Sequence, residues 1–352
     1  MEKQKIAANI RALMERAGDR RIYAALKANA YGLGAVEMAR VCGENGLINF
    51  AVTDGKTAKA VLEAGIPVEE VLLMVSAEPS EIPELARLGV TFTVASEMDA
   101  INLSQYAVKA HIKVDTGMGR RGFLAEDAQS VVSLYGKYPN IRFTGIYTHF
   151  ANGSDRKATR LQFDRFRAVL DTLHKAGIEP GLRHCCASTT VFGDEDMLLD
   201  GVRIGSALLG RVTGMAGGKE LARTGMCQVT IEAVRSLPKG ATAGYGGVYR
   251  APRDMQVAVC AIGTHNGVGV APQVGVQQPM KGLRSLLWII RNRLTGRSVP
   301  TALIGGKRCK LVGTVYSETV MVDVTDVPCQ PGDTALFDIN PILLHDVPVK
   351  FI

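Results

Sequence analysis

The chain has 352 residues, of which 47% are hydrophobic and 21% are charged, a composition typical of a soluble globular protein with room for two domains. No apolar run is long enough to predict a membrane span. The net charge is +7, but eight lysines and arginines lie in the acid-free segment 255–317. The rest of the chain is therefore about neutral, and the overall charge does not indicate nucleic-acid binding.

The seven cysteines are odd in number and include no C-x-x-C pair, which argues against a disulfide framework and against a zinc site. The first twenty residues predict an amphipathic helix and contain no signal-peptide core. We therefore expect a cytoplasmic protein in a reducing compartment, without a bound metal.

In chain order, short β-rich runs alternate with amphipathic helical stretches as far as residue 210. The predicted strands are 22–28, 48–53, 70–75, 91–95, 111–115, 143–149, 181–186 and 202–208, and the predicted helices between them are 35–42, 56–64, 81–88, 125–135 and 157–176. This alternation indicates βα units and a parallel sheet. Eight such strands predict a closed (β/α)₈ TIM barrel of the α/β class.

After residue 210 helical periodicity becomes scarce, apart from 283–294. The β-branched runs are 226–237, 255–263, 302–315, 320–324, 334–337 and 347–352, and Gly, Pro and Asp turns separate them. This pattern predicts a second, mostly antiparallel β domain. We therefore expect a barrel domain over 1–215 and a C-terminal β domain over 216–352.

Reactive side chains follow several predicted strands, and catalytic residues of such barrels lie at the carboxyl ends of strands. Lys27 stands in Leu-Lys-Ala-Asn-Ala-Tyr-Gly-Leu-Gly, where a lysine can form a Schiff base and glycines let a phosphate approach closely. Taken singly, Lys27 could equally be a solvated surface lysine, a histidine at a strand end is more often structural than catalytic, and an arginine in a strand is usually an ion-pair partner. The others at strand ends are Tyr31, Lys113, Arg120, His149, His184, Ser188 and Arg203.

Together these segments resemble the pyridoxal-phosphate-dependent alanine racemases. The shared motifs are Lys-Ala-Asn-Ala-Tyr-Gly-x-Gly, Lys-Val-Asp-Thr-Gly-Met-Gly-Arg, Tyr-Thr-His-Phe-Ala, Val-Arg-Ile-Gly and Gly-Tyr-Gly at 244–246. The resemblance implies a (β/α)₈ barrel with a C-terminal β domain, pyridoxal 5'-phosphate as cofactor, and a homodimer with shared active sites.

The resemblance also implies a two-base mechanism for interconverting L- and D-alanine. Lys27 would hold the cofactor and act as one base, and Tyr245 of the partner subunit would act as the other. Arg203 would face the pyridine nitrogen, and because arginine donates and stays protonated, that nitrogen would remain unprotonated. His149 and His184 would link Tyr245 and Arg203 in one hydrogen-bonded network.

The remaining implied roles concern the phosphate of the cofactor and the carboxylate of the substrate. Tyr31, Ser188, Gly205 and Ser206 would receive the phosphate, as hydroxyl and backbone N–H groups do well. Arg120 would orient the substrate carboxylate, with a carbamylated Lys113 pairing with it.

The chain departs from the family pattern around the substrate. Leu33 replaces the usual histidine, the segments 184–188 and 263–267 differ from His-x-x-Asn-Ser and Gly-Tyr-Ala-Asp-Gly, and Cys-Met-Asp becomes Tyr316-Ser317-Glu318. A phosphate-contacting tyrosine of the family also has no counterpart in 338–342. Ser317 therefore leaves serine or another small amino acid open as the substrate, and supply of D-alanine for the cell wall is the role that the family implies.

Three other functions remain as alternatives. Decarboxylases built on the same plan typically carry Glu-Pro-Gly-Arg and Cys-Asp motifs, which this chain lacks. Single-domain pyridoxal-phosphate carriers lack the β domain. A catalytically degenerate homologue that binds the cofactor would account for the departures listed above.

The segment 281–297 combines an apolar block with flanking cations. Such a segment fits either a membrane-surface or partner-docking insertion or a helix packed on the β domain with solvated arginines, and we favour the packed helix.

Overall fold

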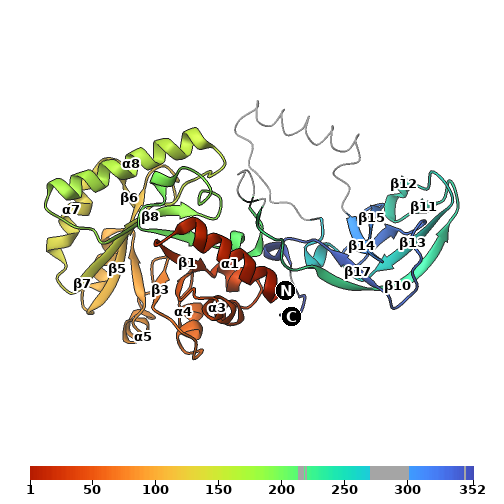
Figure 1. Cartoon of the computed structure of the whole chain (residues 1–352), viewed down its shortest axis with the longest axis horizontal. Coiled ribbons are helices and arrows are strands. Elements are labelled where there is room, and N and C mark those ends of the chain that lie inside the picture. The colour runs from red at the N-terminus through yellow and green to blue at the C-terminus, as the bar shows by residue number, and fades with distance from the viewer. Residues whose placement is uncertain (213–217, 219, 270–300, 345) are drawn as a thin grey trace. The chain divides into compact units, whose positions relative to one another are not determined.

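The computed structural model describes residues 1–212, 218, 220–269, 301–344 and 346–352. The chain forms two compact units, one comprising Met1–Thr224 with Lys350–Ile352 and the other Gly225–Val349. Figure 1 colours the chain from red at the N-terminus to blue at the C-terminus. The predicted helix 283–294 and the basic segment 281–297 lie outside the described residues. Among the residues described, no helix has the length and apolarity needed to cross a membrane.

The first unit is the predicted (β/α)₈ barrel. Its eight main strands are β1 Arg21–Ala25, β2 Asn49–Val52, β3 Glu70–Leu73, β4 Thr91–Val94, β5 Val108–Asp115, β7 Ile141–Tyr147, β8 Leu182–Ala187 and β9 Gly201–Ile204. Neighbouring strands pair in parallel in the order β4-β3-β2-β1-β9-β8-β7-β5, and a pairing of β4 with β5 closes the ring. The short β6 Phe123–Leu124 pairs with the end of β5. The fold class predicted from the sequence is confirmed.

One helix precedes the first strand, and helices or 3₁₀ turns follow most of the strands. They are α1 Lys3–Ala17, α2 Lys27–Tyr31, α3 Ala35–Glu44, α4 Gly55–Leu62, α5 Ile82–Arg87, α6 Glu97–Leu103, α7 Ala128–Lys137 and α8 Arg156–Lys175, with 3₁₀ turns η1 Ala125–Asp127, η2 Glu195–Met197 and η3 Ser206–Leu209. Asp54, Ser96 and Asp155 each cap a helix by accepting a backbone N–H near its start, which supplies partners for donors that have none inside the helix.

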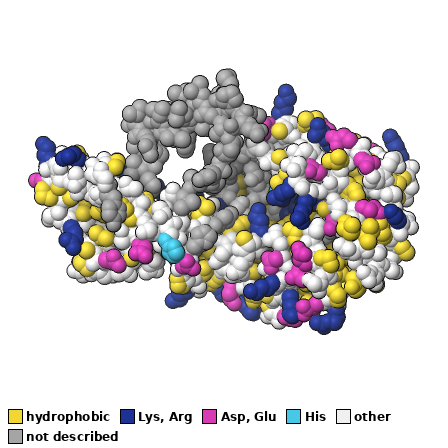
Figure 2. Space-filling view, turned by 180° about the vertical axis from the view of Figure 1, so that it is seen from behind, with side chains coloured by type: hydrophobic (Ala, Val, Ile, Leu, Met, Phe, Trp, Pro, Cys, Tyr) yellow, Lys and Arg dark blue, Asp and Glu magenta, His cyan; other side chains and the backbone are white. Residues whose placement is uncertain are grey.

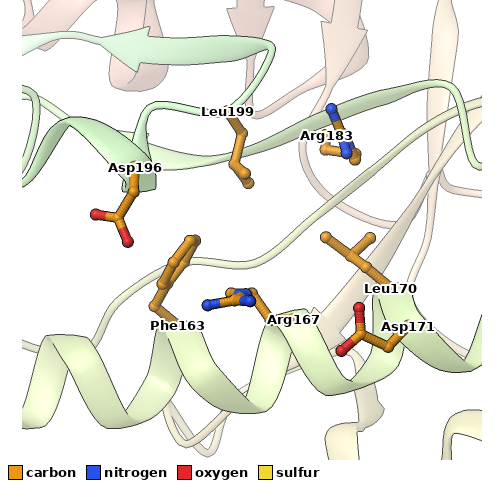
Figure 3. A pocket seen from close by; sticks show the side chains of 7 residues that line it. All are labelled: Phe163, Arg167, Leu170, Asp171, Arg183, Asp196 and Leu199. Carbon is orange, nitrogen blue, oxygen red and sulfur yellow. The ribbon is translucent and has the colours of Figure 1, made fainter.

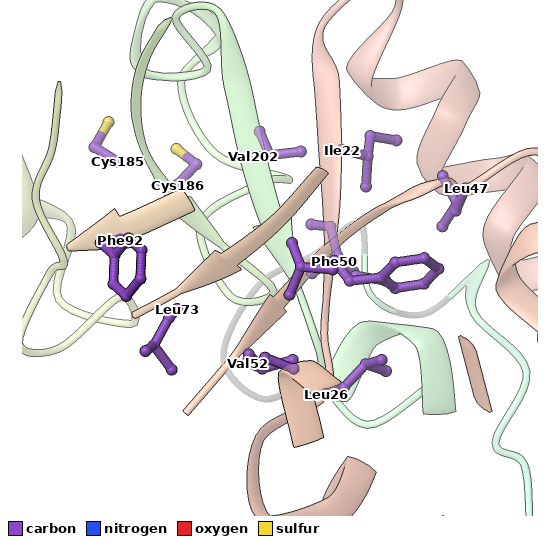
Figure 4. Close-up of a cluster of buried hydrophobic side chains, with 14 of the residues drawn as sticks. Ile22, Leu26, Leu47, Phe50, Val52, Leu73, Phe92, Cys185, Cys186 and Val202 are labelled. Atoms are coloured by element: carbon purple, nitrogen blue, oxygen red, sulfur yellow. The ribbon is translucent and has the colours of Figure 1, made fainter. Parts of the chain in front are cut away.

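The core lies where the strands meet the helices that cover them. Phe50, Val52, Leu73 and Phe92 are buried apolar residues of β2, β3 and β4 (Figure 4). The runs of apolar residues in these strands reflect a sheet buried on both faces. On the molecular face drawn in Figure 2, basic and acidic side chains are interspersed over the larger unit.

The second unit is mostly antiparallel, as predicted. Its strands β10 Cys227–Leu237, β13 Met255–Cys260, β16 Val320–Asp323, β15 Lys307–Val312, β14 Thr301–Ile304 and β17 Thr334–Phe337 form a closed barrel in that order. A separate two-stranded sheet joins β11 Thr242–Ala243 to β12 Tyr249–Arg250. The remaining 3₁₀ turns are η5 Tyr245–Gly247, η6 Thr264–Asn266 and η7 Pro341–Leu343.

Two predicted strands of this unit were wrong. The run 302–315 is two strands, because Gly305 and Gly306 both have positive φ and turn the chain back on itself. The run 347–352 forms no strand. Instead, Lys350–Ile352 belongs to the first unit, where the backbone of Ile352 exchanges hydrogen bonds with Met1 and Lys3.

Candidate active site

The strand that leads to Lys27 is shorter than the sequence predicts. β1 ends at Ala25, and Lys27 begins the five-residue turn α2. Leu26 already leaves the extended region, with φ of −101° and ψ of 32°, and Ala28 and the next three residues have φ of 51, 53, 53 and 61°. Four consecutive non-glycine residues in the left-handed region cannot continue a strand. Such a conformation costs roughly 1–2 kcal/mol per residue, so its surroundings must hold it in place.

Asn29 provides part of that support. Its side-chain Oδ1 accepts the N–H of Ala35 at 2.7 Å, and its backbone carbonyl accepts the N–H of Gly34 at 3.0 Å. The turn after β1 is thereby fastened to the start of α3. Lys27 is solvent-accessible, but desolvation and then the charge of Arg120 lower the pKa of its amine.

The residues predicted to hold a phosphate lie together. The Ser188 hydroxyl accepts the N–H groups of Gly205 and Ala207 at 2.9 and 3.1 Å. The Tyr31 hydroxyl accepts a hydrogen bond from the Ser206 backbone. It also packs so closely on Gly205 that a Cβ there would lie 1.7 Å from the hydroxyl oxygen. Hydroxyl groups and backbone N–H groups thus gather at the start of η3.

Four cations converge at the same end of the barrel. Their combined effect is seen at His149, whose pKa is lowered to about 3 by burial and then by Arg203, Lys27, Lys113 and Arg120. Lys113 is 6% exposed, and burial followed by the charges of Arg120 and Arg203 lowers the pKa of its amine to about 8. A site with this charge favours anionic ligands.

Arg203 connects two of the predicted histidines. The guanidinium is 3% exposed and lies 2.6 Å from Nδ1 of His184 and 3.3 Å from Nδ1 of His149. It also donates to the carbonyl oxygen of Thr148 at 2.7 Å and stacks on the ring of Tyr147 at 4.9 Å. Arg203 is therefore fixed from several sides.

Asp115 organises the loop that carries Arg120, and sequence reasoning missed this role. Its carboxylate accepts four backbone N–H groups, from Gly117, Met118 and Gly119 at Oδ1 and from Arg120 at Oδ2. Burial would raise the pKa of Asp115, but these four bonds lower it overall. The signal was an aspartate directly before a Thr-Gly-Met-Gly turn, a residue type that often accepts nearby backbone N–H groups.

Tyr245 and Ser317 belong to the second unit. Tyr245 begins η5, in the connection between β11 and β12, and Gly244 before it has φ of 85°. The Tyr316 ring packs on Gly244, where a Cβ would lie 1.2 Å from the phenol oxygen. The carbonyls of Tyr316 and Ser317 accept the N–H groups of Thr264 and His265. Two of the segments that depart from the family pattern, 263–267 and 316–318, are thus joined to each other.

A cavity of about 370 Å³ lies elsewhere in the first unit, between α8 and the segments around β8 and η2 (Figure 3). It is lined by Phe163, Arg167, Leu170, Asp171, Arg183, Asp196 and Leu199. None of the residues that the sequence nominated for chemistry is among them, so this cavity is separate from the cluster around Lys27.

Both units match models of a known family. A model described as "Alanine racemase, N-terminal domain" matches residues 1–212, and one described as "Alanine racemase, C-terminal domain" matches residues 226–341. The chain is 32% identical to the alanine racemase of Desulforamulus reducens over 334 residues, which cover 91% of this chain and 84% of that protein. It is 30% identical to the alanine racemase of Methanococcus maripaludis over 318 residues, covering 87% and 78%.

Solved structures share the fold at lower identity. The alanine racemase from a D-cycloserine-producing Streptomyces lavendulae superposes with a TM-score of 0.83 at 22% identity, covering 100% of this chain and 96% of that chain. The enzyme from Streptomyces coelicolor gives a TM-score of 0.83 at 21% identity, covering 100% and 97%.

Proposed function

The chain belongs to the alanine racemase family, a family of pyridoxal-phosphate-dependent isomerases, and from this premise we propose that it interconverts L- and D-alanine. The observation that carries the proposal is the placement of Lys27, whose Nζ lies 5.7 Å from the centre of the Tyr31 ring. It thus lies beside the hydroxyl and N–H groups at the start of η3 and shares the surroundings of His149 with the buried Arg203. A nucleophilic amine with a lowered pKa is what Schiff-base chemistry requires.

The residues of the first unit fit pyridoxal 5'-phosphate. Tyr31, Ser188 and the backbone of Gly205 and Ser206 would hold the phosphate, since hydroxyl and N–H groups converge there. Lys27 would hold the cofactor covalently. When bound, pyridoxal phosphate supplies a conjugated ring that acidifies the α-hydrogen of an attached amino acid.

Two bases on opposite faces of the substrate α-carbon would invert its configuration. Lys27 would remove or return a proton at its Nζ on one face. Tyr245 of a second copy of the chain would do so at its hydroxyl on the other face, which makes the homodimer part of the proposal. Arg203 would donate to the ring nitrogen without giving up its proton.

Arg120 would bind the substrate carboxylate through a charge-assisted hydrogen bond. The lowered pKa of Lys113 raises its fraction of neutral amine, the form that carbamylation consumes. A carbamylated Lys113 would be an anion able to hold Arg120 in place.

A small amino acid other than alanine is the second candidate, and serine is the first to test. The observation that favours it is the altered wall of the second unit, where Tyr316 packs on Gly244 and is followed by Ser317. A third alternative is that the chain binds the cofactor but catalyses no reaction, and only measured turnover excludes it.

Exchange of the α-hydrogen with deuterated water tests these functions together. The cofactor-loaded protein should exchange the α-hydrogen of L- and D-alanine, and a panel including serine ranks the substrates. Lys27→Ala should lose the yellow colour and all exchange, whereas Lys56→Ala on the exposed face of α4 should change neither. No exchange with any amino acid in a yellow protein would refute the racemase function.

Tyr245→Phe tests the two-base assignment. Exchange starting from one enantiomer should fall far more than exchange starting from the other. The matched control is Tyr249→Phe, because Tyr249 lies in β12, directly after the connection that carries Tyr245. This variant should exchange the α-hydrogen normally. Rescue of a bacterial D-alanine auxotroph would test the expected role of a cytoplasmic enzyme supplying the cell wall.

A further inference from the structure

A line of buried polar side chains runs through the inside of the first barrel from Arg203 to Glu70. Arg203 lies 2.6 Å from Nδ1 of His184, whose Nε2 lies 3.0 Å from Nδ1 of His111. Nε2 of His111 in turn lies 3.8 Å from Oε1 of Glu70. Both histidines are at most 1% exposed. The line connects the end of β9, at the candidate active site, with the start of β3 at the opposite end of the strands.

The two ends of this line determine where its protons lie. Arginine only donates, so Nδ1 of His184 accepts and a neutral His184 carries its proton on Nε2. That N–H donates to Nδ1 of His111, which leaves the His111 proton on Nε2, facing the Glu70 carboxylate. Burial lowers the pKa of His111 to about 4, and burial followed by the charge of Arg203 lowers the pKa of His184 further. Both rings are therefore neutral near pH 7.

Glu70 is held as an acceptor from both sides. Its Oε2 accepts from Tyr23 at 2.5 Å and from Arg21 at 3.0 Å, and its Oε1 accepts from Thr91 at 2.7 Å. Burial alone would raise the pKa of Glu70, but the charge that His111 carries in acid and the hydrogen bonds from Tyr23 and Thr91 lower it overall. The glutamate is thus an anion at the far end of an ordered chain of donors.

Arg203 needs such a counter-charge. A buried guanidinium without an anion is costly, and no carboxylate among the described residues forms an ion pair with Arg203. Aligned hydrogen bonds in a low-dielectric interior reinforce one another. Because the two imidazoles donate in the same direction, they transmit the stabilising effect of the Glu70 negative charge to the Arg203 guanidinium.

The barrel also makes room for the orientation of His111. A Cβ on Gly145 of β7 would lie 2.6 Å from Nε2 of His111, so a larger residue would displace the ring. Tyr23 and Tyr147 both stack against His184, with centroid distances of 5.6 and 4.9 Å. The rings of the line are fixed by packing as well as by hydrogen bonds.

We propose that Glu70 and His111 are positioning residues for Arg203, because they fix both imidazoles as Nε2–H tautomers and so keep Nδ1 of His184 available to the guanidinium. The consequence for catalysis rests on the proposed function, since Arg203 is the group that would face the cofactor ring. The tautomers themselves do not depend on the cofactor.

Glu70→Gln is the decisive variant. Tyr23 and Arg21 both donate to Oε2, so the amide oxygen of the glutamine takes that place and its NH₂ group faces His111. The negative charge that favours a proton on Nε2 of His111 is then lost and an NH₂ group faces that nitrogen, so we expect His111 to carry its proton on Nδ1, which opposes the N–H of His184. Glu69→Gln is the matched control, because Glu69 also pairs with Arg21 but makes no contact with either histidine.

The tautomers are read from ¹⁵N NMR of histidine-labelled, cofactor-free protein at pH 7. The wild type and Glu69→Gln should show His111 and His184 protonated on Nε2, and Glu70→Gln should show His111 protonated on Nδ1. A wild-type His184 protonated on Nδ1, or unchanged tautomers in Glu70→Gln, would overturn the proposal. If Glu70→Gln does not fold, a wild-type His111 protonated on Nδ1 would still overturn the proposal.

Activity of the loaded enzyme is the second readout. Glu70→Gln should lower kcat about tenfold with little change in KM, the size expected when a supporting partner of a functional side chain is lost, while Glu69→Gln should keep wild-type kinetics. Inactive wild-type protein with the expected tautomers would refute the proposed function and leave the Glu70–His111 assignment standing. Unchanged kcat in Glu70→Gln would refute the catalytic consequence.

Discussion

The left-handed turn after Lys27 predicts an unusual response to glycine. Ala28 is exposed and has φ of 51° and ψ of 52°, a conformation that disfavours a side chain. Ala28→Gly should therefore stabilise the cofactor-free protein. Ala8→Gly is the matched control, since Ala8 is an exposed alanine inside the right-handed helix α1.

The magnitude follows from two opposing terms. Glycine removes roughly 1–2 kcal/mol of left-handed strain at Ala28, and it gives the unfolded chain about 0.4–1 kcal/mol of additional conformational freedom. The net stabilisation of the first unit should be about 0.5–1 kcal/mol. In Ala8→Gly no strain is relieved, and the change should cost about 1 kcal/mol.

Urea unfolding of the cofactor-free proteins, followed by circular dichroism, measures both effects. The transition midpoint should move up for Ala28→Gly and down for Ala8→Gly, with unchanged slopes. A loss of stability in Ala28→Gly equal to that in Ala8→Gly would refute the left-handed backbone and the strain assigned to it.

Three further predictions concern the surroundings of the site. Because the pKa of Lys113 is about 8, its neutral amine should be abundant from pH 8 upward. Uptake of ¹³C-bicarbonate, followed by NMR, should therefore rise through that pH in the wild type and be absent in Lys113→Met. Equal uptake by the two proteins would refute carbamylation at Lys113. Asp115→Asn should cost about 2 kcal/mol near pH 7 because an amide NH₂ would face the N–H of Arg120. The pKa of Asp115 is lowered on folding, so its contribution to the free energy of unfolding is present above the ordinary aspartate pKa and is lost as the pH falls through the lowered pKa. The urea midpoints of Asp115→Asn and wild type should therefore converge in acid, and midpoints that stay apart would contradict this assignment. Gly205→Ala should displace the Tyr31 hydroxyl and weaken cofactor binding, measured by absorbance. Gly136 in α7 has open space around it, so Gly136→Ala should bind the cofactor normally. Equal binding by the two variants would argue against the phosphate site.

The sequence predicted the elements whose physical signal is local. The β-branched runs around Phe50 and Phe92 are strands because both faces of a parallel sheet are buried. The residues that follow those strands could be nominated together, since carboxyl ends of parallel strands meet at one end of a barrel. The structure places those of the first unit as a cluster.

Other features left little local signal. Nothing in Ala-Asn-Ala-Tyr predicts four left-handed residues, because their conformation is imposed by tertiary contacts such as the bond from Ala35 to Asn29. Glu70 and His111 read as ordinary strand residues, and the line that joins them to His184 and Arg203 draws on four strands, β3, β5, β8 and β9, brought together by closure of the barrel. The pair Gly305-Gly306, in contrast, was a visible turn signal within the predicted strand 302–315.

Closure of the second barrel has a consequence for how copies of the chain can associate. Among the described residues, each of its six strands pairs with two others, so none has one side unpaired along its whole length. The long β10 divides its pairing, with β17 over 227–230 and with β13 over 231–237. Among the described residues of this unit, the small β11–β12 sheet retains open edges, and Tyr245 lies in the connection between its two strands. A second copy of the chain would therefore find no strand with a fully open side on the described part of this barrel, and contact with it would rest mainly on side chains and on this hairpin.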